Sequence, residues 1–326
     1  MKKLLVVLLS LLCVISLAAC SNGGGETTKE TKPTVGVLQL VEHPALDAAT
    51  QGFIDAVKEA FGDEYEVVVK NAGGQGENCI TIANGFVDDG VKLIMANATP
   101  AVQAASTATA EIPVVGTAVT EYGTALGIDN FSGTVGNNVT GASDLAPLVE
   151  QAAMVPEIFP EAKTVSIIYC LTEANSLYQV KAMTEAFEAL GLEVKSFGFN
   201  DTNDVTQVTQ DAAAWGDVMY IPTDNTAAAN TEAIANVVLS DDYLTPVVAG
   251  EEGIASGCGV VTLTISYYDL GVKTGKIAVE ILKGGDPATM PIQYADNFTK
   301  KFNATNAEKF GLTDTLTAAG YIAIEG

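Results

Sequence analysis

The chain has 326 residues, 48% of them hydrophobic, and carries 40 acidic residues against 16 lysines and no arginine, a formal net charge of −24 at pH 7. So acidic a surface excludes nucleic acid and anionic lipid headgroups as favoured partners. The length exceeds what one hydrophobic core usually serves, so we expect two domains.

The N-terminus has the pattern of an export signal. Two lysines precede an apolar stretch over residues 4–17, which is too short to span a bilayer as a resident helix. The following Leu-Ala-Ala-Cys resembles a bacterial lipobox, in which the cysteine, here Cys20, is acylated and becomes the first mature residue. We expect a signal peptide over 1–19, a lipidated flexible spacer over 20–32, and a location at the extracytoplasmic face of the cell membrane. A secretory signal with a chance cysteine is the alternative.

From residue 33 onward, short apolar runs alternate with helical periodicities. Such a βαβ series predicts a parallel sheet. The first series has strands over 34–40, 65–71, 92–97 and 113–119, with helices over 46–61, 78–89 and 100–109. A stretch over 123–141 has no clear period. The second series has helices over 145–159, 176–190, 204–214 and 226–239, with strands over 164–170, 193–199, 217–221 and 246–249.

The two series resemble each other. The strands beginning near Thr34, Lys92 and Pro113 correspond to those near Thr164, Asp217 and Pro246. This correspondence indicates a duplicated α/β unit. Ligands of open parallel sheets bind beyond the carboxyl ends of the strands, so two such lobes point their loops at each other across a cleft.

Polar residues follow the predicted strands at those ends. In the first lobe they are Glu42, His43, Pro44, Ala45, Thr99, Pro100, Thr117 and Thr120; in the second they are Glu173, Asn175, Ser176, Thr223, Asp224, Asn225, Glu251 and Glu252. Hydroxyls and helix-opening amides hold a carboxylate, and acids hold an ammonium group. The pattern predicts a site for a zwitterion, with Asp224, Glu251 or Glu252 as the ammonium partner.

Each of these residues also has a structural interpretation. Asn175, Ser176, Asp224 and Asn225 are ordinary helix-capping types, and the two prolines suit a first helical turn. His43 is the sole histidine and either lines the cleft or packs locally. Four tyrosines lie near the proposed loops as stacking partners: Tyr122, Tyr220, Tyr267 and Tyr268. Trp215 precedes a strand and is expected to pack within the second lobe.

Signals of enzymatic chemistry are weak. The glycines over 271–276 imitate a phosphate loop, but their spacing is one residue short and they belong to a predicted amphipathic helix ending at Leu282. A lone histidine cannot build a multi-histidine metal site. Cys79, Cys170 and Cys258 permit at most one bridge, and buried free thiols are favoured over a disulfide. We predict a binding protein with no enzymatic activity, no cofactor and no metal.

Several short motifs, taken in order, resemble one family. They are Val-Glu-His-Pro-Ala-Leu-Asp at 41–47, Ala-Thr-Pro at 98–100, Thr-Ala-Val-Thr at 117–120, Asn-Val-Thr-Gly-Ala-Ser-Asp at 138–144, Glu-Ala-Asn-Ser at 173–176, Pro-Thr-Asp-Asn-Thr at 222–226, Gly-Glu-Glu-Gly at 250–253 and Tyr-Tyr-Asp-Leu-Gly at 267–271. The chain thereby resembles the tryptophan/tyrosine-type substrate-binding lipoproteins of ABC importers, and Asp144 joins the candidate ligand-binding residues.

The resemblance implies the α/β fold of a type I periplasmic binding protein, with two Rossmann-like lobes joined by a three-crossing hinge. We place the crossings near Ser143, Thr264 and Pro291. The first lobe then comprises 33–142 plus 265–290, and the second 143–264 plus 291–326.

The family also implies a function. We expect a monomer that carries an amino acid-like ligand, aromatic in most members, to an ABC permease and ATPase. Two alternatives remain: a binder of an aliphatic, sugar-like or other small polar ligand, and a surface sensory protein.

Overall fold

A computed structural model of the chain describes residues 32–324, so the predicted signal peptide and Cys20 lie outside the described residues. Residues 33–324 belong to one compact unit. Within the described range, no helix combines the length and the apolar character needed to cross a membrane.

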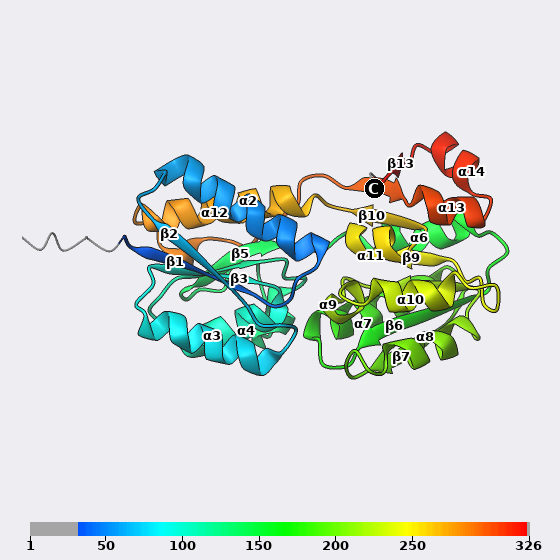
Figure 1. Cartoon of the computed structure of the whole chain (residues 1–326), viewed down its shortest axis with the longest axis horizontal. Helices are drawn as coiled ribbons and strands as arrows, with labels where there is room; N and C mark the ends of the chain where they lie inside the picture. Colours follow the sequence, from blue (N-terminus) through cyan, green and yellow to red (C-terminus); the bar gives the residue numbers. More distant parts are fainter. Residues whose placement is uncertain (1–31, 325–326) are drawn as a thin grey trace, which may run out of the picture. The chain divides into compact units, whose positions relative to one another are not determined.

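The first lobe is built around a six-stranded sheet (Figure 1). Its elements are β1 (Thr34–Gln39), α2 (Pro44–Phe61), β2 (Glu66–Asn71), α3 (Gly76–Asp88), β3 (Leu93–Asn97), α4 (Thr99–Ala108), β4 (Val114–Thr117), α5 (Tyr122–Leu126), β5 (Val139–Ser143), α12 (Tyr267–Leu282), η1 (Pro287–Thr289) and β11 (Gln293–Tyr294).

The second lobe is built around a seven-stranded sheet. Its elements are α6 (Leu148–Ile158), β6 (Thr164–Cys170), α7 (Ala174–Ala189), β7 (Glu193–Phe199), α8 (Val205–Ala213), β8 (Val218–Ile221), α9 (Asn225–Ala228), α10 (Thr231–Val238), β9 (Val247–Ala249), α11 (Glu252–Gly257), β10 (Val261–Thr264), β12 (Thr299–Phe302), α13 (Ala304–Lys309), α14 (Thr313–Ala318) and β13 (Ile322–Ala323).

The two sheets share one strand order. The first runs β2-β1-β3-β4-β5-β11, and the second runs β7-β6-β8-β9-β10-β12-β13. The five leading strands are parallel in both, whereas β12 runs antiparallel to β10. The matching order supports the predicted duplication, and in each lobe it brings the loops after β1, β3 and β4, or after β6, β8 and β9, to one edge of the sheet.

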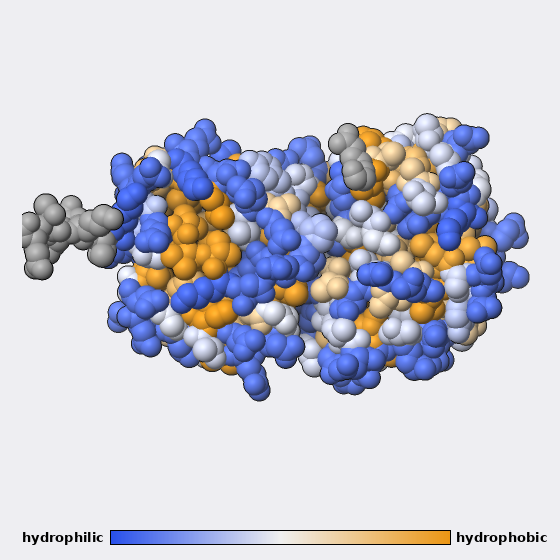
Figure 2. All heavy atoms as spheres, in the orientation of Figure 1, coloured by the Kyte–Doolittle hydropathy of each residue, from blue (hydrophilic) through white to orange (hydrophobic). Residues whose placement is uncertain are grey.

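Both faces of each sheet are covered, which explains the continuous apolar runs in the sequence. In β1, Val35 and Val37 pack with Phe53 of α2 and Ile277 of α12, whereas Leu38 belongs to a cluster on the opposite face with residues of α3 and α4. In the second lobe, α6 and α7 cover one face of the sheet, and α8 and α10 cover the other. Figure 2 shows a largely hydrophilic surface with apolar patches over both lobes. On edge strand β2, Val69 is 45% exposed.

Glycines allow α2 and α12 to approach closely. A Cβ at Gly52 would collide with the carbonyl oxygen of Tyr268, and one at Gly271 with that of Ala49. The glycines that imitate a phosphate loop are therefore packing residues inside α12, which ends at Leu282 as predicted. This packing attaches α12 to the first lobe.

The chain passes between the lobes three times. It leaves the first sheet after β5, returns between β10 and α12, and leaves again after β11. We expected the last crossing near Pro291, but β11 pairs with β5 and keeps Gln293–Tyr294 on the first sheet. The crossing therefore follows Tyr294; the strand was missed because it has only two residues, both exposed.

Several other elements differ from the sequence prediction. The stretch over 123–141, which has no period, leads into β5, and the predicted helix over 226–239 is divided into α9 and α10.

Cys79, Cys170 and Cys258 are buried free thiols. Trp215 packs against Phe197 of the second lobe, with ring centroids 6.1 Å apart, as expected.

Candidate functional site

The facing strand ends of the two sheets enclose a central cavity. Its walls are made by His43, Leu46, Ala118, Thr120, Asp144, Asn175, Thr223, Asp224, Asn225, Ala228, Glu251 and Tyr267. The cavity volume is ≈ 10 Å³, about the space of a single water molecule. Within residues 32–324, two polar side-chain contacts join the lobes: the Oγ1 atoms of Thr120 and Thr223 lie 3.3 Å apart, and His43 Nε2 lies 3.5 Å from Asn225 Oδ1. The lobes are therefore closed on each other.

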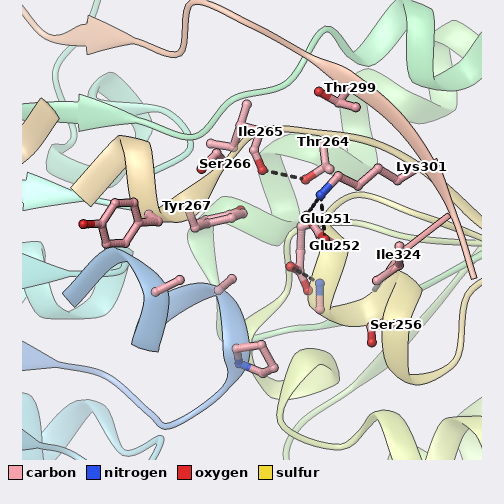
Figure 3. Close-up of a pocket in the computed structure, with 15 residues that line it drawn as sticks. Glu251, Glu252, Ser256, Thr264, Ile265, Ser266, Tyr267, Thr299, Lys301 and Ile324 are labelled. Atoms are coloured by element: carbon pink, nitrogen blue, oxygen red, sulfur yellow. Dashed lines mark hydrogen bonds and ion pairs between the residues drawn. The ribbon is translucent and has the colours of Figure 1, made fainter. Parts of the chain in front are cut away.

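Two larger cavities flank the central one. The first, of ≈ 400 Å³, shares Glu251 and Tyr267 with the central cavity and is also lined by Pro44, Ala45, Ala48, Glu252, Gly253, Ser256, Thr264, Ile265, Ser266, Tyr268, Thr299, Lys301 and Ile324 (Figure 3). We call it the hinge-side cavity because it includes the second crossing. The other, of ≈ 490 Å³, shares Asn225 with the central cavity and includes Pro100 and Glu173.

A hydrogen-bonded network fixes the wall of the second lobe. Glu173 accepts bonds from the backbone and side chain of Asn225 through Oε2, at 3.0 and 2.6 Å, and from the backbone and hydroxyl of Thr226 through Oε1, at 2.9 and 2.8 Å. Asp224 accepts from the amide of Ala227 through Oδ1, and from the amide of Cys170 and the hydroxyl of Ser176 through Oδ2. Both carboxylates are thus satisfied within their own lobe and hold the start of α9 in place.

Glu251 and Glu252 are also engaged within the second lobe. Glu251 caps α11 by accepting the amides of Gly253 and Ile254, each at 2.6 Å. Glu252 forms an ion pair with Lys301 at 2.7 Å (Figure 3). Burial raises the pKa of Glu251 to about 7, and burial together with the neighbouring Glu173 raises that of Asp224 to about 7. The hydrogen bonds from the backbone oppose both shifts.

Asp144 has a different environment. It follows β5 on the first crossing, is 5% exposed, and accepts the Tyr267 hydroxyl at Oδ2 at 2.9 Å. Among the described residues, its Oδ1 has no hydrogen-bond partner; the same holds for His43 Nδ1 and Asn175 Oδ1. Burial raises the pKa of Asp144 and lowers that of His43. Three polar atoms from both lobes therefore remain unpaired on residues that line the central cavity.

The predicted site residues can be sorted by the cavity that they line. His43, Thr120, Asp144, Asn175, Thr223, Asp224, Asn225 and Glu251 line the central cavity. Pro44, Ala45 and Glu252 line the hinge-side cavity, and Pro100 and Glu173 line the other.

Four predicted residues lie elsewhere. Glu42 is exposed beside a surface pocket of the first lobe, and Ser176 holds Asp224 without lining a cavity. Thr117 accepts the hydroxyl of Thr274 inside the first lobe, because a residue still within β4 points into its packing against α12. Thr99, buried in the first turn of α4, is not among the residues lining these three cavities.

Of the four tyrosines, only Tyr267 lines the central cavity. The hydroxyls of Tyr122 and Tyr220 bond to Ala142 O and Gln151 Oε1 inside the lobes, and Tyr268 is 42% exposed with its hydroxyl on Asp55. Tyr267 was one of the four predicted stacking partners, but it was not among the predicted polar ligand-binding residues. Its position after Ser266, which caps α12, was the available signal. No group of three or more His, Cys, Asp or Glu side chains within residues 32–324 could hold a metal ion.

Comparisons with known proteins agree with this architecture. The family model for ABC transporter substrate binding proteins matches residues 34–317. A tyrosine-binding protein of Clostridioides difficile is 33% identical over 307 residues, 90% of this chain and 88% of that protein. An ABC domain from Streptococcus pneumonia, solved in complex with L-Trp, is 29% identical with a TM-score of 0.83, covering 89% of this chain and 100% of that one.

A third relative is a ligand-free structure. A substrate binding protein with adhesive properties from Clostridium difficile, solved ligand-free and open, is 31% identical over 90% of this chain and 99% of that one, with a TM-score of 0.68. The open structure and the L-Trp complex are about equally similar to this chain in sequence, and the TM-score to the L-Trp complex is the higher of the two.

Proposed function

The chain belongs to the family of ABC transporter substrate binding proteins, and we propose that it captures an aromatic amino acid between its lobes for the permease and ATPase of an importer. Proteins of this family work outside the cytoplasm. Lipid attachment at Cys20 would keep the protein beside its permease, and the spacer over 20–32 would give the lobes freedom to move.

One observation carries the proposal: three residues that line the central cavity, drawn from both lobes and from a crossing between them, each have an unpaired buried polar atom. A buried polar atom without a partner costs on the order of 1–3 kcal/mol. His43 Nδ1 belongs to the first lobe, Asn175 Oδ1 to the second, and Asp144 Oδ1 to a crossing between them. A ligand that pairs with these atoms is therefore bound best when the lobes are closed, as in a hinge-closing binding protein.

The carboxylate of an amino acid also has partners in this chain. Without arginine, it must bind hydroxyls, amides or a lysine. Helix α2 begins beside the cavity, and its N-cap residue, His43, makes no side-chain capping bond. The hydroxyls of Thr120 and Thr223 line the same cavity from opposite lobes. The first-turn amides of α2 and these hydroxyls favour an anionic group.

The aromatic ligand class rests on the relatives and on one ring. The L-Trp complex and the tyrosine-binding protein are both near 30% identical over most of the chain. Tyr267 lies between the central and hinge-side cavities, where it can stack on an aromatic side chain for about 0.5–1.5 kcal/mol beyond burial. The hinge-side cavity, with Pro44, Ala48 and Ile265 in its walls, offers an apolar compartment for that side chain.

A ligand screen tests the proposal. The unlipidated protein is titrated calorimetrically with L-tyrosine, L-tryptophan, L-phenylalanine, L-leucine and ribose, while small-angle scattering follows the distance between the lobes. We expect the aromatic amino acids to bind with compaction, and a ligand at about 100 times its Kd to add about 2.7 kcal/mol of stability. Binding of leucine or ribose alone would contradict the aromatic ligand class. Binding without compaction would contradict hinge closure.

The anchor is tested separately. Cys20→Ala should move the protein from the membrane fraction to the soluble fraction without changing ligand affinity. A variant that remains membrane-bound would contradict lipidation at this cysteine.

A further inference from the structure

The carboxylates around the central cavity differ in their remaining hydrogen-bonding capacity. Asp224 and Glu251 each accept two backbone amides of their own lobe. Glu252 is paired with Lys301. Asp144 accepts the Tyr267 hydroxyl at Oδ2, the Thr120 hydroxyl lies near enough to help lower its pKa, and its Oδ1 is buried with no hydrogen-bond partner among the described residues. Asp144 therefore has the strongest unmet demand for a cationic partner.

No lysine lines the central cavity. The only basic side chain there is His43, whose pKa burial lowers, so it is neutral at physiological pH. When Asp144 is ionised, a positive charge beside it would therefore have to come from a bound group.

The neighbouring acceptor defines the shape of that group. Asn175 Oδ1 is also unpaired, on a side chain 5% exposed, and lines the same cavity from the second lobe. The Asn175 amide nitrogen donates to Glu173 and to the Thr223 carbonyl, which fixes its oxygen as the atom left over. A primary ammonium has three donors and the size of a water molecule, which suits two or three acceptors around ≈ 10 Å³.

We propose that Asp144 receives the ammonium group of the ligand and, through its bond to Tyr267, transmits ligand capture to the hinge. Asp144 stands on the first crossing and Tyr267 directly after the second. A cation bound at Asp144 and Asn175 therefore connects the second lobe to two of the three crossings. The inference rests on the proposed function and names the recognition group of that same site.

Proton linkage adds a distinct signature. Burial raises the pKa of Asp144, so its protonated form persists at a higher pH than that of an ordinary aspartate. The titratable groups facing it are Tyr122, Tyr267, Glu251, Asp224 and His43, and none supplies a positive charge at neutral pH. An ammonium group beside Asp144 lowers that pKa, so ligand binding releases a proton in mildly acidic buffer.

The closing experiment compares L-tyrosine with its deaminated analogue, 3-(4-hydroxyphenyl)propionate. Calorimetry is run on the wild type, Asp144→Asn, Tyr267→Phe and the control Asp242→Asn, an exposed aspartate in the turn before β9 of the second lobe. We expect Asp144→Asn to weaken L-tyrosine binding on the order of 100-fold and to abolish discrimination between the two probes. Asp242→Asn should behave as the wild type, and Tyr267→Phe should be intermediate.

Two further measurements complete the test. In mildly acidic buffers of different ionisation enthalpy, the wild type should release a proton on binding L-tyrosine, and Asp144→Asn should not. Undiminished discrimination in Asp144→Asn would overturn the inference.

If neither probe binds the wild type, the proposed ligand class fails, and the unliganded proteins decide about Asp144. If Asp144 is an unpaired buried carboxylate, Asp144→Asn should have a melting temperature no lower than that of the wild type. Methylammonium chloride should raise the melting temperature of the wild type more than sodium chloride does. In Asp144→Asn the two salts should have the same effect. Loss of stability in Asp144→Asn, or equal responses of the wild type to the two salts, would overturn the assignment.

Discussion

The two walls of the central cavity are stabilised in different ways. On the second-lobe wall the two carboxylates are satisfied within their own lobe, because Glu173 and Asp224 accept amides and hydroxyls from residues of that lobe, and only the amide oxygen of Asn175 is left without a partner among the described residues. The opposite wall depends on partners from outside its lobe, since His43 bonds across to Asn225 and Asp144 retains a free oxygen. A carboxylate whose oxygens are all hydrogen-bonded within its own lobe contributes to the stability of that lobe. A carboxylate with an unpaired oxygen is available to bind a ligand.

The largest expected effect therefore concerns folding and not binding. Asp224→Ala removes the acceptor of two buried amides and of the Ser176 hydroxyl. We expect the free energy of unfolding to fall by about 2–4 kcal/mol. A lost helix cap costs about 0.5–2 kcal/mol, and each buried donor left without an acceptor costs about 1–3 kcal/mol in addition. Denaturant titration measures it.

Asp217 provides the matched control. It also accepts two backbone amides in the second lobe, but it is exposed. Asp217→Ala should therefore cost less, because water replaces the lost acceptor. If Asp224→Ala and Asp217→Ala were equally stable while only the first lost ligand, Asp224 would be a ligand-binding residue and the contrast between the walls would be wrong.

The second prediction uses the pKa of Glu251, which is raised to about 7 from 4.5. Between these values the folded protein holds a proton that the unfolded chain has lost, so the free energy of unfolding falls as pH rises, by up to about 1.4 kcal/mol per unit per group. Asp224 acts in the same direction. We expect wild-type stability to decline from mildly acidic to neutral pH.

Glu251→Gln should flatten this decline, as measured by denaturant titration across that pH range. His43 and Asp217, with lowered pKa values, work in the opposite direction, but they are the same in both proteins and cancel in the comparison. Identical slopes for the two proteins would show that Glu251 titrates normally.

The third prediction concerns the hydroxyl contact between the two walls of the central cavity, where we expect a smaller effect. The Thr120 and Thr223 hydroxyls meet across the cleft, and Thr223 also accepts a bond from Gln179 within its lobe. Thr120→Val, Thr223→Val and the double variant form a cycle in the affinity for L-tyrosine. We expect a coupling energy of about 0.5–1.5 kcal/mol, because the pair forms only when the lobes close. Strictly additive effects would mean that the hydroxyl contact contributes nothing to closure.

Most of the fold could be predicted because buried parallel strands are continuous apolar runs. Val35 to Leu38 is such a run, and in β6 Val165, Ile167 and Ile168 are buried apolar residues interrupted only by the small, buried Ser166. Alternate residues of each strand pack into clusters on opposite faces of the sheet. Strand β5 gives no comparable signal: it has the sequence VTGAS, and it becomes a strand because β4 offers it a buried edge. Its pairing is a tertiary effect that local periodicity does not contain.

The sequence predicted several residues that line the central cavity, but it did not predict the hydrogen-bond partners of each acid. Asp144 and Asp224 both follow strands, and nothing local distinguishes them. Asp224 stands at the start of α9 and finds amides to accept, whereas Asp144 enters an irregular crossing that offers it Tyr267 from a distant part of the sequence. A carboxylate loses its free oxygens when the fold places it beside the unpaired amides at a helix start. The tertiary structure therefore determines which acid keeps a free oxygen.

The smallest predicted effect tests whether closure leaves the lobes themselves unchanged. Trp215 packs on Phe197 and near Lys195, and it lines none of the three cavities. If the lobes move as rigid bodies, its surroundings stay the same, and L-phenylalanine, which barely absorbs in that range, should leave its emission maximum unshifted. Tyr268→Trp, at the hinge-side cavity, provides the positive control in a Trp215→Phe background and should respond to the same titration. A shift in the emission maximum of Trp215 itself would mean that ligand binding repacks the interior of the second lobe. The lobe would then not move as a rigid body.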